Sequence, residues 1–239
     1  MKQILVFGHK NPDTDSICSA ISFAELKNAQ GVNVIPCRLG NVSKETQFAL
    51  NHFGAEAPLF IENVNADENG KKEVILVDHN EKAQTADGIE SAKILEVVDH
   101  HKFALTTDEP LKITADTVGC TCTLIYRLFK QAGITPSKKA AGLMMSAIIS
   151  DTLLFKSPTC TPEDVEAVKE LSKICGEENY EDYGMKLLIE GTSLSDKTPE
   201  EIITIDMKEF DMNGKKVAVA QVNTCLLYTS DAADEARSV

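Results

Sequence analysis

The first hundred residues alternate between short apolar-rich runs and stretches with helical periodicity. The runs, each followed by glycine or a polar residue, are 4–7, 32–37, 74–77 and 95–98, and helical spacing occurs over 16–28 and 44–53. Runs without polar alternation are typical of parallel strands buried on both faces, with helices as crossovers. The pattern therefore predicts an α/β fold: a doubly wound, mainly parallel sheet with flanking helices.

The following part of the chain is helical by the same criterion. Apolar residues at helical spacing predict helices over residues 121–132, 138–150, 161–174 and 180–190. Thr161 illustrates a helix start, because its hydroxyl can cap free amides while Pro162 suits the first helical position. The small polar stretch GTSLSDKTP, which begins at Gly191, predicts a linker between two domains.

We therefore expect a metal-binding catalytic domain over 1–191, a linker over 192–197, the start of a smaller, incomplete α/β domain over 198–224, and an atypical tail over 225–239. Within the smaller domain a strand is expected over 217–222. The tail shows neither strand alternation nor a convincing amphipathic helix. About 45 residues after the linker are too few for an independent core.

The composition is that of a globular chain with a strong acidic excess. Hydrophobic residues make up 43% and charged residues 26%, which excludes disordered, collagen-like and coiled-coil classes. The formal net charge is −13, a sign that repels nucleic-acid backbones and anionic membranes, so neither is an expected partner. No apolar run approaches the ~18 residues of a membrane span, and the first residues enter a strand-like segment at once, without the basic n-region or cleavage site typical of a signal peptide. We expect a cytoplasmic location.

The seven cysteines are scattered without framework spacing, which favours reduced thiols over disulfides. The one close pair, Cys120 and Cys122, lacks the C-x2-C partners of a structural zinc site. Packing in the core is therefore the expected role of this pair.

Histidine and aspartate residues gather where the predicted strands end. His9, Asp13 and Asp15 lie in the loop GHKNPDTDS, between the first strand and the first helix. In an open α/β sheet, ligands collect at the carboxyl ends of strands, near the point where strand order reverses. Pro12 stiffens the loop, so these side chains can converge at a lower entropic cost. The alternative roles of Asp13 and Asp15 are a turn and a helix cap.

Later positions carry the same residue types. Asp78 follows a predicted strand in the motif VDHNE, and Asp99, His100 and His101 follow the next strand in VVDHH. Adjacent side chains at a strand end diverge, so the two histidines are expected to have different roles. Asp151 closes the apolar helix GLMMSAIISD, where the negative end of the helix dipole requires a cation, either a lysine or a metal ion.

Together these positions offer two imidazoles and four carboxylates as metal ligands, with His101 in reserve: His9, Asp13, Asp15, Asp78, His100 and Asp151. Oxygen donors with some imidazole and no thiolate favour manganese, cobalt or magnesium. Six side chains exceed what one ion needs if it keeps open positions, so two ions that share a bridging aspartate fit better. Two divalent ions ~3.5–4 Å apart produce a hydroxide nucleophile near neutral pH and bind phosphoryl oxygens, the chemistry of phosphate-ester and phosphoanhydride hydrolysis.

Four motifs, in this order and spacing, closely resemble those of the manganese-dependent family II inorganic pyrophosphatases of the DHH phosphoesterase superfamily: GHKNPDTDS, VDHNE, VVDHH and AIISDTLLFKSPT. The resemblance extends over residues 1–224. It implies a large N-terminal α/β domain that holds the metals and a smaller C-terminal domain that closes over pyrophosphate. The implied activity is hydrolysis of pyrophosphate to two phosphates by a dinuclear metal-bound hydroxide, without a covalent enzyme intermediate.

The resemblance also implies roles for individual residues. One ion would be held by His9, Asp13 and Asp78, and the other by Asp15, His100, Asp151 and the shared Asp78. His101 and Asp151 are implied as catalytic residues, and His101 would assist proton transfer near the substrate. Lys208, in IDMKEF, matches the family's first phosphate-binding lysine. Two Mn²⁺ or Co²⁺ ions are the implied cofactors, with additional Mg²⁺ arriving with the substrate, and a homodimer through the first domain is the implied assembly.

The sequence departs from the family pattern after residue 224. Family members continue to an Arg-Lys-Lys type motif that binds the outer phosphate, and residues 225–239 contain no such motif, so the chain resembles a C-terminally truncated member. Loss of such donors commonly costs ~10²-fold or more in rate. Two alternatives to a pyrophosphatase stay open: a DHH-type phosphodiesterase for short oligonucleotides or dinucleotides, and an inactive metal-binding fragment that lacks the C-terminal substrate domain.

Overall fold

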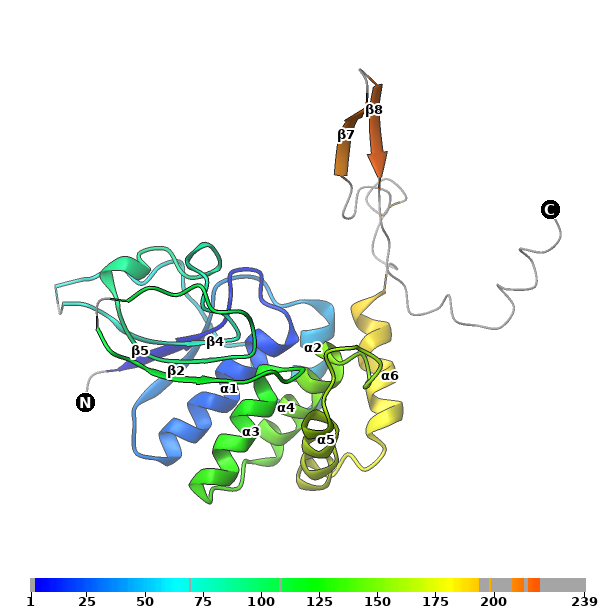
Figure 1. Cartoon of the computed structure of the whole chain (residues 1–239). Coiled ribbons are helices and arrows are strands. Elements are labelled where there is room, and N and C mark those ends of the chain that lie inside the picture. The colour runs from blue at the N-terminus through cyan, green and yellow to red at the C-terminus, as the bar shows by residue number, and fades with distance from the viewer. Residues whose placement is uncertain are drawn as a thin grey trace.

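The computed structural model describes residues 3–68, 70–107, 109–193, 198, 208–212 and 215–219. Its main feature is a six-stranded sheet with helices packed against it (Figure 1). The strands are β1 (Ile4–Phe7), β2 (Val34–Arg38), β3 (Leu59–Phe60), β4 (Glu73–Val77), β5 (Lys93–Asp99) and β6 (Lys112–Ala115). Their order across the sheet is β3-β2-β1-β4-β5-β6, and each neighbouring pair is parallel. The predicted doubly wound parallel sheet is confirmed.

The strand order reverses between β1 and β4. From β1 the chain moves outward through β2 to β3, and it then returns to the other side of β1 and continues through β4, β5 and β6. The loops that follow β1 and β4 therefore leave from adjacent strand ends and run in opposite directions. This is the usual place for a ligand site in such a sheet.

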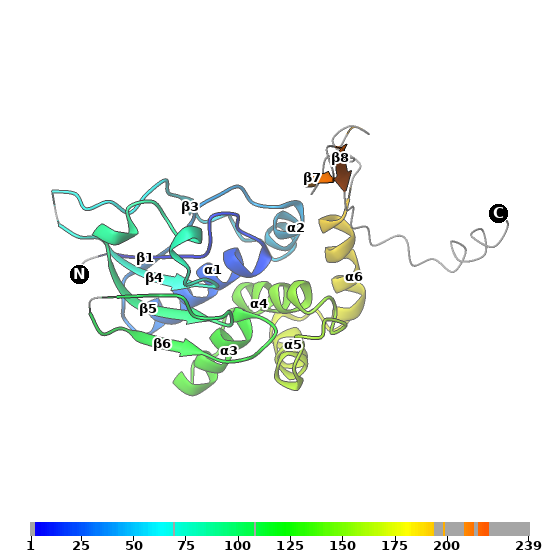
Figure 2. The same cartoon turned by 45° about the horizontal axis from the view of Figure 1, so that its top comes forward.

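Within the described ranges, six α-helices accompany the sheet: α1 (Thr14–Ala29), α2 (Lys44–His52), α3 (Thr121–Ala132), α4 (Lys138–Asp151), α5 (Pro162–Cys175) and α6 (Tyr180–Gly191). α1 and α3 contact the sheet, and α4 packs against both of them. α5 packs on α4, and α6 packs on α2 and α4. Figure 2 shows this arrangement, with the sheet on the left and α4, α5 and α6 on the right.

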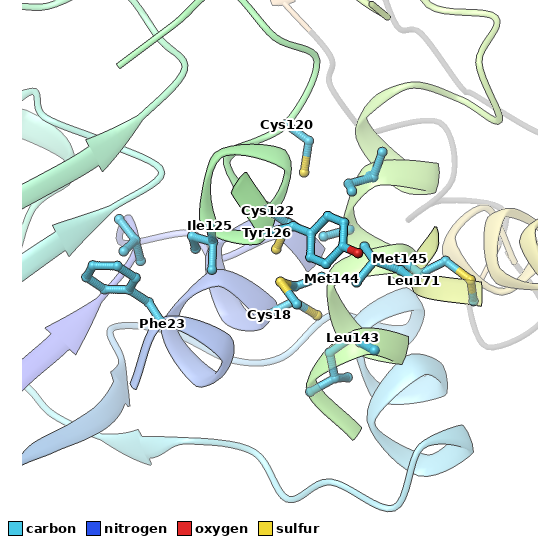
Figure 3. Close-up of a cluster of buried hydrophobic side chains, with 14 of the residues drawn as sticks. Cys18, Phe23, Cys120, Cys122, Ile125, Tyr126, Leu143, Met144, Met145 and Leu171 are labelled. Carbon is cyan, nitrogen blue, oxygen red and sulfur yellow. The ribbon is translucent and has the colours of Figure 1, made fainter. Parts of the chain in front are cut away.

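The main core lies between α1, α3, α4 and α5. α4 is buried along residues 140–149 because other helices surround it, which explains its almost continuously apolar sequence. Figure 3 shows part of this core, including Phe23 of α1, Ile125 of α3, Met144 of α4 and Leu171 of α5. Cys120 and Cys122 are buried in the same core, so the packing role predicted for them is confirmed.

A smaller core covers the opposite face of the sheet. Phe7 of β1, Leu76 of β4 and Val97 of β5 pack there against Val64 and Ile89. The covering chain consists of loops and two short 3-10 helices, η1 (Lys82–Gln84) and η2 (Ile89–Ser91). Loops and single turns therefore cover a face that longer helices cover in many doubly wound sheets.

Most predicted helices and strands agree with the structure to within two residues at each end. α5 begins as expected, with a capping box in which the Thr161 side chain accepts from Asp164 N and the Asp164 side chain accepts from Thr161 N. β6 was not predicted. Three of its four residues are exposed, and an exposed edge strand has no apolar run that could reveal it.

In the region of the expected second domain, the structure describes an antiparallel hairpin of β7 (Lys208–Met212) and β8 (Lys215–Val219). β8 begins two residues before the strand predicted over 217–222, and residues 220–222 lie outside the described part. Residues 194–197 of the predicted linker and the tail over 225–239 also lie outside it, so the predicted domain bounds stay predictions. Among the described helices, none has the length and apolar character needed to span a membrane.

Candidate metal centre

The loop after β1 carries three of the predicted ligands to the point where strand order reverses. Gly8 permits the close approach of this loop to α1, since a Cβ at Gly8 would lie 1.8 Å from Ser16 Oγ. Asp13 is the N-cap of α1, and its Oδ1 accepts a hydrogen bond from Ser16 N at 2.9 Å. Its Oδ2 lies 3.4 Å from His9 Nε2. Asp13 therefore caps the helix with one carboxylate oxygen and directs the other, a potential metal ligand, towards the site.

Asp78, directly after β4, completes a first cluster with this loop. His9 Nε2 lies 3.4 Å from Asp78 Oδ2 as well as from Asp13 Oδ2. Ligand atoms from the three residues all lie within 4.8 Å of one another, which is close enough for one cation to contact all three. We call His9, Asp13 and Asp78 the loop group.

A second cluster, called the buried group below, consists of Asp15, His100 and Asp151, whose ligand atoms also lie within 4.8 Å of one another. The Asp15 side chain is completely buried near the start of α1. Its oxygens accept hydrogen bonds from Thr121 N at 2.7 Å, Cys122 N at 3.1 Å and Ser19 Oγ at 2.8 Å. These neutral donors fix the carboxylate in the absence of any ion.

The other two members of the buried group are also fixed by their surroundings. The Val118 carbonyl accepts a hydrogen bond from His100 Nδ1 at 3.1 Å, which leaves Nε2 available for a metal ion. Asp151 is the last residue of α4. The chain after it has positive φ values of 48°, 52° and 68° at Leu153, Leu154 and Phe155. Three consecutive non-glycine residues with left-handed backbone angles are strained, and such strain is concentrated at functional sites.

Asp78 links the two groups. Its Oδ2 faces His9, and its Oδ1 lies 3.6 Å from His100 Nε2. The residue is 2% exposed and has a φ of 59°, a left-handed conformation that aspartate tolerates better than most residues. Oδ1 accepts a hydrogen bond from Thr121 Oγ1 at 3.2 Å, but Oδ2 has no hydrogen-bond donor. A buried carboxylate oxygen without a donor is costly, so a cation at Oδ2 would be strongly favoured.

Burial and mutual repulsion oppose ionisation of two of these carboxyl groups. Burial and the charge of Asp15 raise the pKa of Asp78 to about 7. Burial, together with the charges of Asp15 and Asp78, raises the pKa of Asp151 well above its usual range. Burial also opposes ionisation of Asp15, but His100 and the hydrogen bond from Ser19 outweigh it and lower the pKa of Asp15. The ionised form of Asp15 is therefore stabilised by its surroundings, whereas the negative charges of Asp78 and Asp151 need a compensating positive charge.

The two imidazoles supply that compensation when no ion is bound. Burial lowers the pKa of His9, but Asp13 and Asp78 outweigh burial and raise it to about 10. Burial likewise lowers the pKa of His100, but Asp78 and Asp15 raise it to about 9. Both imidazoles therefore hold a proton near neutral pH, and a bound cation would have to replace these protons.

The residues present fit divalent ions of the manganese type. Carboxylates and imidazoles without thiolate suit such ions, and Asp78 Oδ2, which accepts no hydrogen bond, is an oxygen that such an ion could contact once the His9 proton is displaced. Within the described ranges, no lysine or arginine forms an ion pair with Asp15, Asp78 or Asp151. The sequence offered a lysine or a metal ion as the partner of Asp151, and the described residues provide no such lysine. The loop group would hold one ion, and the buried group, with Asp78, the other.

The thiols beside Asp15 do not extend this donor set. Sulfur atoms of Cys120 and Cys122 lie within 4.8 Å of an Asp15 oxygen. Burial raises the pKa of Cys122 to about 12, and burial and Cys122 raise that of Cys120 well above its usual range. Both side chains stay protonated near neutral pH, and the protonated thiol is not the form that ligates metals.

His101, the predicted catalytic residue, lies at the rim of the two groups. Its Nδ1 donates to Asp99 Oδ1 at 2.9 Å and lies 3.8 Å from Asp78 Oδ1. The His101 side chain is 53% exposed, whereas Asp99 is completely buried and also accepts hydrogen bonds from His101 N at 3.0 Å and Asn80 Nδ2 at 2.6 Å. Lys208, the predicted phosphate-binding lysine, begins β7, but its side chain lies outside the described residues.

Sequence reasoning missed the residues that orient the ligands. Thr121 and Val118 belong to a segment without any motif, so nothing in the sequence indicated them. Two others left a signal: Ser19 lies four residues after Asp15 on the same helix face, and Asn80 lies within the VDHNE motif. Asp99 was noted as part of VVDHH, but its hydrogen bond to His101 became visible only in the structure.

Comparison with known proteins gives the family of this chain. The family model described as DHH family, N-terminal domain, matches residues 3–148, and the DHHA2 domain matches residues 185–238. A Bacillus cereus protein, named a probable manganese-dependent inorganic pyrophosphatase, is 54% identical over 224 residues, which cover 93% of this chain and 71% of the relative. This chain belongs to the manganese-dependent inorganic pyrophosphatase family. A Bacillus anthracis relative of the same name is 53% identical over the same shares.

Solved structures agree with membership of this pyrophosphatase family. A Methanococcus jannaschii protein assigned to the family II inorganic pyrophosphatases superposes with a TM-score of 0.78 at 43% identity, over 98% of this chain and 76% of that one. An exopolyphosphatase-related protein from Bacteroides fragilis has a TM-score of 0.61 at 17% identity, over 84% of this chain and 59% of that one. The second likeness concerns the fold alone.

Proposed function

We propose that this chain hydrolyses inorganic pyrophosphate to two phosphates, with two manganese ions held between the loop group and the buried group. The observation that carries the proposal is the position of Asp78. One of its oxygens faces His9 of the loop group, and the other faces His100 of the buried group. A carboxylate placed in this way can contact two ions at once, and the names of the relatives support manganese and pyrophosphate.

Two divalent cations in such a site supply an activated water for attack on phosphorus and neutralise phosphate oxygens. The chain itself contributes positioning. Asp15 is fixed by hydrogen bonds from neutral donors, and the Val118 carbonyl sets the orientation of the His100 ring. Such preorganisation avoids reorganisation of the site during the reaction. The cations would also make an acidic protein, of net charge −13, attractive to an anionic substrate.

We assign proton transfer to His101. Its Nδ1 is occupied by Asp99, so Nε2 is the nitrogen that can exchange a proton with bound substrate. The hydrogen bond to Asp99 raises the pKa of His101 above its ordinary value, which favours the imidazolium form. In that form His101 can protonate the departing phosphate.

Three finer expectations from the sequence stay predictions. They are phosphate binding by Lys208, a homodimer through the first domain and a cytoplasmic location. Size-exclusion chromatography with light scattering would test the second of these directly.

The test of the proposed function is phosphate release from pyrophosphate in the presence of Mn²⁺. Asp78→Asn should abolish release, whereas Asp87→Asn should retain it, because the Asp87 side chain is 73% exposed and pairs with Lys10 rather than with the metal ligands. A short oligonucleotide, assayed side by side, should not be cleaved. Equal phosphate release by Asp78→Asn and the wild-type chain would refute the proposal.

A further inference from the structure

The segment 118–122, which leads into α3, contacts three of the proposed ligands. The Val118 carbonyl accepts from His100 Nδ1, and Thr121 donates to Asp15 through its amide and to Asp78 through its hydroxyl. A displacement of this one segment would therefore disturb Asp15, His100 and Asp78 together. What fixes the segment also fixes the ligands.

Asp164 of α5 binds this segment through two hydrogen bonds. Its Oδ2 accepts a hydrogen bond from Gly119 N at 2.9 Å, and its Oδ1 accepts one from Thr123 Oγ1 at 2.5 Å. Gly119 lies beside Val118, and Thr123 lies two residues after Thr121. Asp164 thus holds both ends of the part that touches the ligands, although it contacts no ligand itself.

Asp164 is a rigid anchor because its own position is fixed. It is completely buried, and its Oδ2 also accepts hydrogen bonds from Thr161 N and Thr161 Oγ1, each at 2.7 Å. Within the described ranges no lysine or arginine pairs with it. A buried carboxylate of this kind depends on its hydrogen-bond donors, so the anchor and the segment stabilise one another.

Gly119 fits closely between the end of α4 and the start of α5. A Cβ at this position would lie 2.8 Å from Thr152 Cγ2 and 2.9 Å from Asp164 Oδ2. Thr152 directly follows the ligand Asp151. The contact between Gly119 and Asp164 can therefore be broken from either side, by removing the carboxylate or by adding a methyl group.

We propose that Asp164 is a positioning residue for the metal centre: through Gly119 N and Thr123 it holds segment 118–122 in the place that Asp15 and His100 require. The inference rests on the proposed function, since it takes its ligands from there. The competing explanation is that Asp164 serves only the capping box of α5. In that case its loss would lower stability without changing affinity for the metal.

The test is Mn²⁺ binding to the full chain, measured by the electron paramagnetic resonance signal of free Mn²⁺, together with the melting temperature without metal. Asp164→Ala and Gly119→Ala should each weaken one of two Mn²⁺ sites by about 10-fold or more, the usual cost of losing an outer partner of a metal ligand. The other site should weaken less, because of its three residues only the shared Asp78 contacts segment 118–122, through Thr121, whereas His9 and Asp13 do not. Non-additive losses in the double variant would show that both changes break the same contact.

Two further variants keep the test decisive. Asp164→Asn can keep an oxygen towards Gly119 and Thr161 and donate from its amide to Thr123 Oγ1, so it should fold and show a smaller loss at the same site. Asn179→Ala is the matched control, because it removes the side chain that caps α6 and should lower the melting temperature with both Mn²⁺ affinities unchanged.

Unchanged Mn²⁺ affinities in Asp164→Asn and Gly119→Ala, with lowered melting temperatures, would overturn the inference. Phosphate release by the wild-type preparation separates this failure from failure of the proposed function. A wild-type chain that binds two ions but releases no phosphate would refute the proposed function, while a selective loss in the variants would still support Asp164. A wild-type chain that binds no Mn²⁺ would refute both.

Discussion

The loop group and the buried group use similar donors but are held in different ways. In the loop group, the Asp13 side chain is 56% exposed and comes from a loop, and its position is set by a single hydrogen bond from Ser16 N. In the buried group, Asp15 is completely buried and accepts three hydrogen bonds, and His100 is oriented by Val118. The comparison teaches that the fold holds the side chains of the buried group more firmly than the exposed Asp13 of the loop group. Asp78 belongs to both and couples them.

The largest expected effect comes from the shared residue. Asp78→Asn should remove a ligand of both ions, so phosphate release should fall by more than the ~10²-fold that loss of an outer partner costs. Titration with Mn²⁺ should show weakening of both sites rather than of one. If only one site weakened, Asp78 would not be shared and the comparison above would lose its basis.

The second effect is the pH dependence of Mn²⁺ affinity. The pKa values of His9 and His100, about 10 and about 9, lie above 8, so both imidazoles are protonated between pH 6 and 8 when no ion is bound. Each ion must displace such a proton, and the ion of the buried group must also displace the proton that Asp151 keeps. The affinity of each site should therefore rise at least about tenfold per pH unit over this range, and more steeply for the buried group. Isothermal titration calorimetry in buffers of different ionisation enthalpy would measure the protons released. Affinities that do not change with pH would contradict the protonated state of the free site.

The third effect compares two neighbouring aspartates. Asp15→Asn can keep an oxygen towards Ser19 Oγ and Cys122 N, but its amide NH2 then faces the Thr121 N–H. This clash of donors should lower the free energy of unfolding by about 1–3 kcal/mol, besides weakening the ion of the buried group. Asp13→Asn should change the free energy of unfolding by less than about 0.5 kcal/mol, because asparagine caps helices as well as aspartate does. It should weaken only the binding of the ion at the loop group. Urea unfolding without metal, with Mn²⁺ titration of both variants, measures the contrast. Equal destabilisation by the two substitutions would show that the groups do not differ in preorganisation.

The smallest effect is a gain in stability. Burial and the charges of Asp15 and Asp78 raise the pKa of Asp151. The folded chain therefore keeps a proton that the unfolded chain loses above about pH 4, so Asp151 destabilises the metal-free fold increasingly as the pH rises. Asp151→Asn should raise the metal-free melting temperature at pH 8 by about 2–4 °C, equivalent to about 1 kcal/mol.

The same variant should lose most of the stabilisation by the ion of the buried group, while the ion of the loop group should still stabilise it; in the wild-type chain each ion should contribute about 2.7 kcal/mol at 100 times its dissociation constant. Differential scanning calorimetry at pH 5 and pH 8 would measure both changes. A metal-free variant less stable than the wild-type chain at pH 8 would contradict the proposed repulsion.

Much of the fold could be predicted because its local signals agree with its packing. The runs that became β1 and β4 are buried on both sides of the sheet, and the start of α5 carries a complete cap. β6 could not be predicted, since it is an exposed edge strand. The loops over the second face of the sheet have no periodicity, so only the structure could show that Val64 and Ile89 cover it.

For the candidate site, the donors could be predicted but not what holds them. Aspartates and histidines after strand ends are visible in the sequence, because parallel strands bring their carboxyl ends to one edge. The left-handed conformation of Asp78 and the contacts of segment 118–122 depend on residues far apart in the chain. Asp164 lies 45 positions from Gly119, and its sequence signal indicated only a helix start.

The most direct test of the central claim is the electron paramagnetic resonance spectrum of the chain loaded with two equivalents of Mn²⁺. Two ions bridged by Asp78 at ~3.5–4 Å should give the signal of a spin-coupled pair, and Asp78→Asn should lose it. A spectrum of isolated Mn²⁺ ions that grows in proportion to the metal added, in the wild-type chain as in the variant, would contradict the account.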